Sequence, residues 1–186
     1  QGDDIVFQYG KEFPVSFNES EKSRFQSNGI SIEDSFPIIE GRYRLTILLQ
    51  NTVGKEFSLY EKEMVIPEVE GPPQISGPFL GYKFENYGTQ VHIPYKVLDK
   101  KLVIDPRNTF STGEQLAFLF NVKNCPADVW KTGQVRVLIK GMRPADPSQK
   151  SFSFELRNSS YNRIINFVQS FPLSELSPDY YQMTLT

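Results

Sequence analysis

His92 and Cys125 are the single histidine and the single cysteine of this 186-residue chain. Hydrolysis through a Ser–His–Asp or Cys–His arrangement would have to use His92. This histidine falls inside a predicted strand, directly before Ile93-Pro94, and the sequence contains no Gly-x-Ser-x-Gly elbow. A zinc site needs several His or Cys ligands, more than one residue of each type can supply. We therefore interpret His92 as an ordinary strand residue and Cys125 as a small packed side chain.

Acidic residues are the next candidates for chemistry, because calcium ions that brace tandem β-modules bind hard oxygen ligands on loops. The acids at predicted strand ends or in the linker are Asp3, Asp4, Glu68, Glu70, Asp99 and Asp105. They form no dense Asp-x-Asp-x-Asp loop, and 22 acids spread along the chain single out no pair for glycoside hydrolysis. We therefore expect no metal, no cofactor and no catalytic residue, and keep a hydrolase of unassigned type as an alternative.

Aromatic side chains are the remaining candidates, since exposed rings bind sugars and anchor protein partners. Tyr82 and Tyr87 lie near the start of the predicted second module, and Trp130 lies in a predicted loop over 126–132. In a chain with 15 Phe and 9 Tyr, packing into a core is the competing interpretation. We take Tyr82, Tyr87 and Trp130 as candidate ligand-contact residues.

Bulk composition narrows the class of protein. A net charge of −2 provides no field that would gather nucleic acid or anionic lipid. No apolar run approaches the roughly 20 residues that span a bilayer, so we expect neither nucleic-acid binding nor membrane insertion. The aromatic fraction of 13% favours β-structure.

These residues need strands to position them, and the clearest strand is Tyr43–Leu49. Tyr43, Leu45, Ile47 and Leu49 alternate with other residues at the period of a strand with one buried face. A glycine-led turn with a tyrosine at the strand's start is typical of an antiparallel sandwich, in which the hydroxyl bonds nearby backbone.

This segment occurs twice. Phe36-Pro37-Ile38 and Tyr43–Ile47 recur as Phe171-Pro172-Leu173 and Tyr181–Leu185. The spacing is 135 residues from Phe36 to Phe171 and 138 from Tyr43 to Tyr181. The repeat predicts two modules of similar construction.

The fold class that we predict is all-β, with two tandem antiparallel β-sandwich (immunoglobulin-like) modules. Residues 1–69 form the first, 70–73 a Pro/Gly linker and 74–186 the second; we expect the first to be incomplete at its N-terminus and the second at its C-terminus. Predicted strands in the first are Ile5–Phe7, Phe13–Phe17, Ile30–Phe36, Tyr43–Leu49 and Glu56–Ile66, the last with a β-bulge at Tyr60–Glu63. Those in the second are Phe79–Phe84, Val91–Val97, Leu102–Ile104, Leu116–Val122, Val135–Ile139, Phe152–Leu156, Ile164–Gln169 and Tyr180–Thr186.

Several short sequence segments resemble the region C-terminal to the GWxTD domain in bacterial GWxTD-domain proteins. They are Phe13-Pro14-Val15, Phe36-Pro37-Ile38, Glu40–Leu45, Asn51–Phe57, Glu61-Lys62, Ile66-Pro67, Phe110–Leu116 and Leu176–Tyr181. The naming motif itself is absent, because Trp130 is followed by Lys131-Thr132-Gly133. The resemblance implies an exported bacterial protein, periplasmic or extracellular, and it carries over no catalytic residue.

Together these features predict a non-enzymatic structural or protein-interaction module. Its partner would be another protein or the rest of its own parent chain. A carbohydrate-binding module that uses surface aromatics, with a glycan as ligand, is the first alternative, and a hydrolase is the second. Because Tyr180–Thr186 contains neither lysine nor proline, we also expect weak self-association through this strand's edge.

Overall fold

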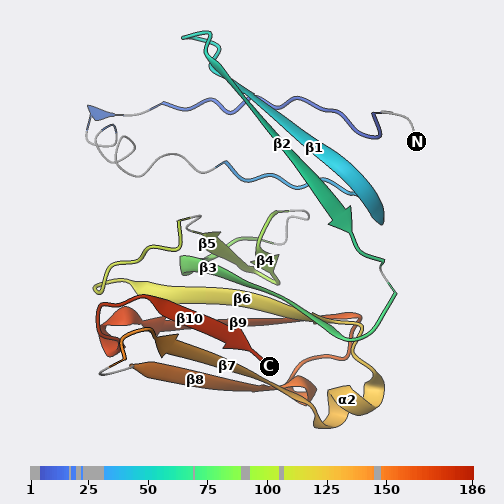
Figure 1. Ribbon diagram of the computed structural model, residues 1–186, viewed down its shortest axis with the longest axis vertical. Helices are drawn as coiled ribbons and strands as arrows, with labels where there is room; N and C mark the ends of the chain where they lie inside the picture. Colours follow the sequence, from blue (N-terminus) through green and yellow to red (C-terminus); the bar gives the residue numbers. More distant parts are fainter. Residues whose placement is uncertain are drawn as a thin grey trace. The chain divides into compact units, whose positions relative to one another are not determined.

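The computed structural model describes residues 5–16, 18–19, 22, 32–68, 70–88, 93–104, 107–144 and 148–186. The chain divides into two compact units, Gln1–Glu33 and Asp34–Thr186. Across the described residues it is mostly β, with three antiparallel sheets and one minor helix (Figure 1). The coarse prediction of a β fold is therefore confirmed, while the division at 70–73 stays a prediction.

The first unit contains no strand among its described residues. The predicted strands Ile5–Phe7 and Phe13–Phe17 are wrong over 5–7 and 13–16, and Phe17 lies outside the described residues. The predicted strand Ile30–Phe36, which crosses into the second unit, is also wrong over 32–36. Alternation makes a face apolar, but a strand also needs a partner to complete its hydrogen-bonded ladder.

Strands β1 (Gly41–Gln50) and β2 (Phe57–Ile66) form an antiparallel hairpin with continuous register from Gly41↔Ile66 to Gln50↔Phe57. Asn51 organises the turn between them. Its side-chain oxygen accepts the N–H groups of Val53 and Gly54 at 3.1 and 3.2 Å. Its backbone N–H donates to the Glu56 carbonyl at 2.8 Å, which extends the ladder beyond the strands.

The β-bulge predicted at Tyr60–Glu63 is wrong, because the register runs through these residues without a shift. Leu59 shares a face with Leu48, whereas Met64 shares the opposite face with Tyr43. A change of hydrophobic phase requires a bulge only where one face must stay buried throughout. Both faces of this hairpin carry apolar side chains, so the strand stays regular.

The five-stranded sheet has the order β4-β5-β3-β6-β9 and is curled into a half-barrel. Its strands are β3 (Gln74–Asn86), β4 (Lys96–Val97), β5 (Lys100–Ile104), β6 (Gln115–Lys123) and β9 (Ile164–Pro172). The predicted strand Val91–Val97 shrinks to β4, because Pro94 and Tyr95 form a turn; Val91 and His92 lie outside the described residues.

The three-stranded sheet has the order β10-β7-β8. It consists of β7 (Gln134–Gly141), β8 (Gln149–Glu155) and β10 (Tyr181–Leu185), and short 3-10 turns, η1 (Leu156–Asn158) and η2 (Leu173–Glu175), follow β8 and β9. Residues that we predicted as a loop form the helix α2 (Ala127–Thr132). Pro126 precedes it with φ of −62°, and proline favours helix starts because its φ is already fixed.

One core joins β6 and β9 to the three-stranded sheet, which Figure 1 shows beside them. The Phe120 ring centroid lies 5.0 Å from that of Phe167 in β9 and 5.2 Å from that of Phe154 in β8. A second cluster covers the other face of β6, where Ala117 and Leu119 pack with Leu102 of β5. β6 is apolar on both faces because each face meets a separate cluster.

Candidate functional site

Two of the three aromatic candidates belong to the β3 region. Tyr82 is half-buried, and its ring meets Phe110 edge-on at 5.3 Å between centroids. Tyr87 follows β3 and is 41% exposed, with the Lys101 ammonium 5.9 Å from its ring centroid. Tyr82 thus supports the edge of the core, whereas Tyr87 offers an accessible ring beside a cation.

Trp130 occupies α2 and is half-buried against the main core. Its indole N–H donates to the Ser159 carbonyl at 3.2 Å, which ties the helix to the segment after η1. Its ring centroid lies 5.4 Å from that of Tyr161, a residue that is 53% exposed. The sequence pattern did not single out Tyr161, although an aromatic residue among the polar residues 158–163 is a usable signal.

A hollow of about 480 Å³ is linked to this aromatic pair through Ser159, although neither ring of the pair lines it. Ser159, which accepts the Trp130 hydrogen bond, also lines the hollow. Its lining combines hydroxyl, amide and carboxylate groups with two phenylalanine rings. The lining residues are Ser153, Phe154, Glu155, Asn158, Ser159, Asn166, Phe167 and Val168. None of Tyr82, Tyr87 and Trp130 lines it, so the three sequence candidates do not share this site.

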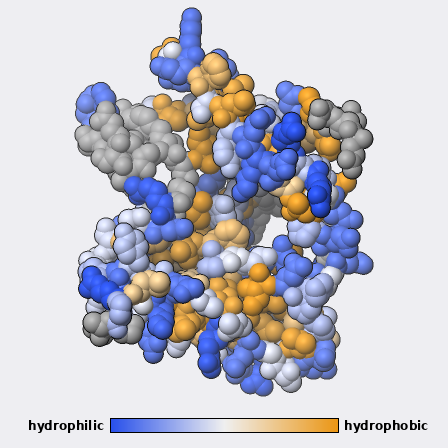
Figure 2. All heavy atoms as spheres, in the orientation of Figure 1, coloured by the Kyte–Doolittle hydropathy of each residue, from blue (hydrophilic) through white to orange (hydrophobic). Residues whose placement is uncertain are grey.

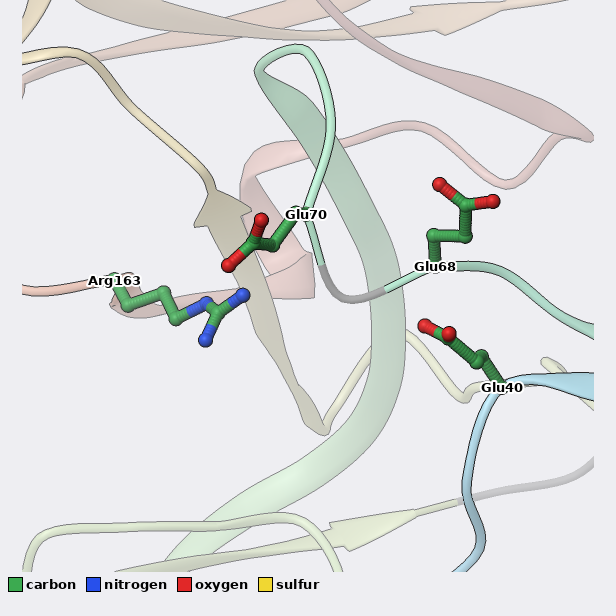
Figure 3. A pocket seen from close by; sticks show the side chains of 4 residues that line it. All are labelled: Glu40, Glu68, Glu70 and Arg163. Atoms are coloured by element: carbon green, nitrogen blue, oxygen red, sulfur yellow. The ribbon is translucent and has the colours of Figure 1, made fainter.

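A second hollow, of about 490 Å³, is lined by Glu40, Glu68, Glu70 and Arg163. Figure 3 shows the Glu70 carboxylate turned toward the Arg163 guanidinium, while the Glu68 carboxylate points away from that of Glu40. Glu68 and Glu70 were calcium candidates, and the structure adds Glu40 to them. Over the described part of the chain, however, no three His, Cys, Asp or Glu side chains lie close enough to hold a metal ion.

The other calcium candidates lie elsewhere. Asp99 sits in the turn between β4 and β5, and its carbonyl accepts the Tyr87 N–H at 2.6 Å. Asp3, Asp4 and Asp105 lie outside the described residues. The three described candidates, Glu68, Glu70 and Asp99, therefore do not converge on one point.

The Asp179 carboxylate and the Cys125 thiol are largely buried groups, and their surroundings favour a structural role over a catalytic one. The Asp179 side chain is 9% exposed, and its two oxygens accept the N–H groups of Arg143 and Tyr180 at 2.9 and 2.8 Å. Burial, with a smaller contribution from Asp128, raises the pKa of the Cys125 thiol. A raised pKa makes the thiolate scarce at neutral pH, so Cys125 is a poor nucleophile.

The β1–β2 hairpin carries large apolar side chains that are exposed on both faces. On one face Leu48 lies opposite Leu59, and they are 62% and 57% exposed. Phe57 extends this face and is 74% exposed, while Ile47 and Tyr60 pair on the other face. Figure 2 shows orange, hydrophobic atoms at the surface near the hairpin tip at the top of the view. We call Leu48, Phe57 and Leu59 the hairpin patch.

No family model, no curated protein and no solved structure matches the chain. Among the described residues, no helix is long and apolar enough to cross a membrane.

Proposed function

We propose that this chain is a non-enzymatic structural or protein-interaction module of an exported bacterial protein, built from two tandem antiparallel β-sandwich modules. The repeat supports the tandem arrangement, because its two copies share a tyrosine–backbone bond. The Tyr43 hydroxyl donates to the Glu40 carbonyl at 3.3 Å, and the Tyr181 hydroxyl donates to the Ser177 carbonyl at 2.5 Å. The rings shared between β6, β9 and β8 support a sandwich in the second module.

The hairpin patch is the observation that carries the interaction role. A two-stranded hairpin is marginally stable by itself in water, and exposed apolar patches mark surfaces that contact a partner. Among the described residues, neither Leu48 nor Leu59 belongs to or packs against either apolar cluster. Their cross-strand pairing places apolar area where another protein can cover it.

Photo-crosslinking tests this role. A photoreactive side chain at Leu59 should yield a discrete cross-linked protein in the exporting bacterium. The same group at Glu61, two residues along the same face, should yield much less, because this part of the face is charged. Leu48→Thr should abolish the Leu59 product without lowering the melting temperature. Equal products from both positions, or none from Leu59, would contradict the proposal.

A carbohydrate-binding module is a second candidate, favoured by the Trp130–Tyr161 pair and by the hollow with hydroxyl and amide groups that Ser159, the hydrogen-bond partner of Trp130, lines. An aromatic face with adjacent hydrogen-bonding groups suits a sugar ring. A glycan array should then show a ligand that Tyr161→Ala loses and Tyr87→Ala keeps. An array without binders removes this candidate. No observation on the described residues favours the hydrolase.

A further inference from the structure

The two edges of β10 differ in their pairing. Toward β7, the Met142 N–H donates to the Tyr180 carbonyl at 2.9 Å, and Thr186 exchanges two hydrogen bonds with Arg136 at 2.8 and 3.0 Å. Even-numbered residues of this strand therefore direct their backbone groups to β7, because these groups alternate between edges. The backbone groups of Tyr181, Met183 and Leu185 point to the opposite edge, where no described strand pairs with β10.

In β1 the odd-numbered residues, not the even-numbered ones, direct their backbone groups to the paired edge. The ladder with β2 ends in the bond from the Asn51 N–H to the Glu56 carbonyl, so odd-numbered residues of β1 face β2. Tyr43, Leu45 and Ile47 thus direct their backbone groups toward β2. Even-numbered residues direct theirs to the other edge of β1, where no described strand pairs.

The sequence repeat aligns these two strands residue by residue. Tyr43 matches Tyr181, and the 138-residue spacing then matches Leu45 with Met183. Both tyrosines and both of these partners are half-buried, so the tyrosine-bearing face is the more covered face at these positions in both copies. The edge of β1 that β2 occupies is therefore the same edge that β10 leaves unpaired.

We infer that the free edge of β10 is a docking site for one further antiparallel strand with the chemistry of β2. The hairpin register places apolar Met64 opposite Tyr43 and aromatic Tyr60 opposite Ile47. The partner should correspondingly place apolar side chains opposite Tyr181 and Leu185. These two and Met183 lie half-covered against the rim of the main core, so an added strand would complete their burial.

A second copy of the chain is the competing occupant. A symmetric β10–β10 pair centred on Met183 would satisfy the same backbone groups. We favour the β2-like strand because the chain already contains this pairing on the equivalent edge of β1, across ten residue pairs. β10 itself has only five residues, which limits the ladder of a symmetric pair. The inference goes beyond the proposed function and does not depend on the hairpin patch.

Grafting tests the inference on the full chain. Thr186 matches Leu48 in the repeat, so a copy of residues 49–67 appended after Thr186 should fold back onto β10 in the hairpin's register. The exchange rates of the amide protons of Tyr181, Met183 and Leu185 should then fall by about tenfold or more. A peptide of residues 56–67, added in trans to the unmodified chain, should slow the same three amides if the graft itself fails to fold.

Two proline variants of the graft provide matched controls. In the hairpin, Lys62 directs its N–H toward the neighbouring strand, whereas Glu61 directs its N–H away from it. Lys62→Pro in the grafted copy should remove the protection, and Glu61→Pro should preserve it, since proline is tolerated at an outward-facing position. The inference is overturned if neither graft nor peptide protects the three amides. It is also overturned if the unmodified chain protects them in a concentration-dependent way, because a second copy then occupies the edge.

Discussion

The β1–β2 hairpin and the β7–β8–β10 sheet contain the two copies of the repeat, yet they differ in burial. Tyr43 and Tyr181 both begin a strand and both bond an upstream carbonyl. β10 has β7 beside it and the main core beneath it, whereas β1 has only β2 among the described strands. The repeated sequence segment therefore forms the same local structure in both places, but only long-range packing makes one copy part of a core.

The largest expected difference between the two regions concerns phenylalanine. Phe120 is fully buried and contacts three other rings, so Phe120→Ala should destabilise the fold by about 3–5 kcal/mol. Phe57→Ala in the hairpin should change the free energy of unfolding by less than about 0.5 kcal/mol, as for other exposed positions. Urea denaturation measures both values. Comparable losses would show that the hairpin is buried in solution.

Asp179 should produce the next largest effect. Its carboxylate joins the end of β7 to the start of β10, and Asp179→Ala leaves the N–H groups of Arg143 and Tyr180 without this acceptor. We expect a loss of about 1–3 kcal/mol by chemical denaturation. Asn162→Ala is the matched control, because its exposed side-chain oxygen accepts the N–H of the adjacent Arg163 at 2.7 Å. An equal loss in both variants would contradict a special role for Asp179.

The paired tyrosine hydroxyls allow a direct comparison of the copies. Tyr181→Phe removes a 2.5 Å hydrogen bond beside the core and should cost about 1 kcal/mol. Tyr43→Phe removes a 3.3 Å bond in the hairpin and should cost less than about 0.5 kcal/mol. Denaturation midpoints of the two variants decide the order. The reverse order would mean that the first copy is the better packed one.

Cys125 should show the smallest effect on stability, confined to alkaline pH. Burial raises its folded pKa above the ordinary value of 9.0, so the neutral thiol is favoured in the folded state. This contribution is fully present below pH 9.0 and is lost as pH rises through the folded pKa. Cys125→Ala should flatten the alkaline decline in melting temperature. An unchanged decline would contradict the assignment.

Thiol labelling extends the same comparison to the hairpin. Iodoacetamide should label Cys125 slowly in the folded chain, because the thiol is buried. A cysteine placed at exposed Ser58 in a Cys125→Ala background should react at the rate of a free thiol. Equal rates at the two positions would place Cys125 at the surface in solution.

The sequence by itself determined those strands whose hydrophobic pattern agrees with the neighbours that they meet in the folded chain. The predicted strands Leu116–Val122 and Val135–Ile139 correspond to β6 and β7, and the predicted strands Tyr43–Leu49 and Glu56–Ile66 correspond to the hairpin. The bond of Tyr43 to nearby backbone followed from its place after a glycine-led turn. These features depend on neighbours within a few residues, which is why one sequence sufficed.

Tertiary structure decided the rest. Residues 13–16 alternate as well as a strand does, but no described strand pairs with them. The pairing of Trp130 with Tyr161 and of β10 with β7 joins segments distant in the chain. Strand pairing and burial are long-range properties, set by which surfaces meet in the folded chain, so local residue patterns constrain them only weakly.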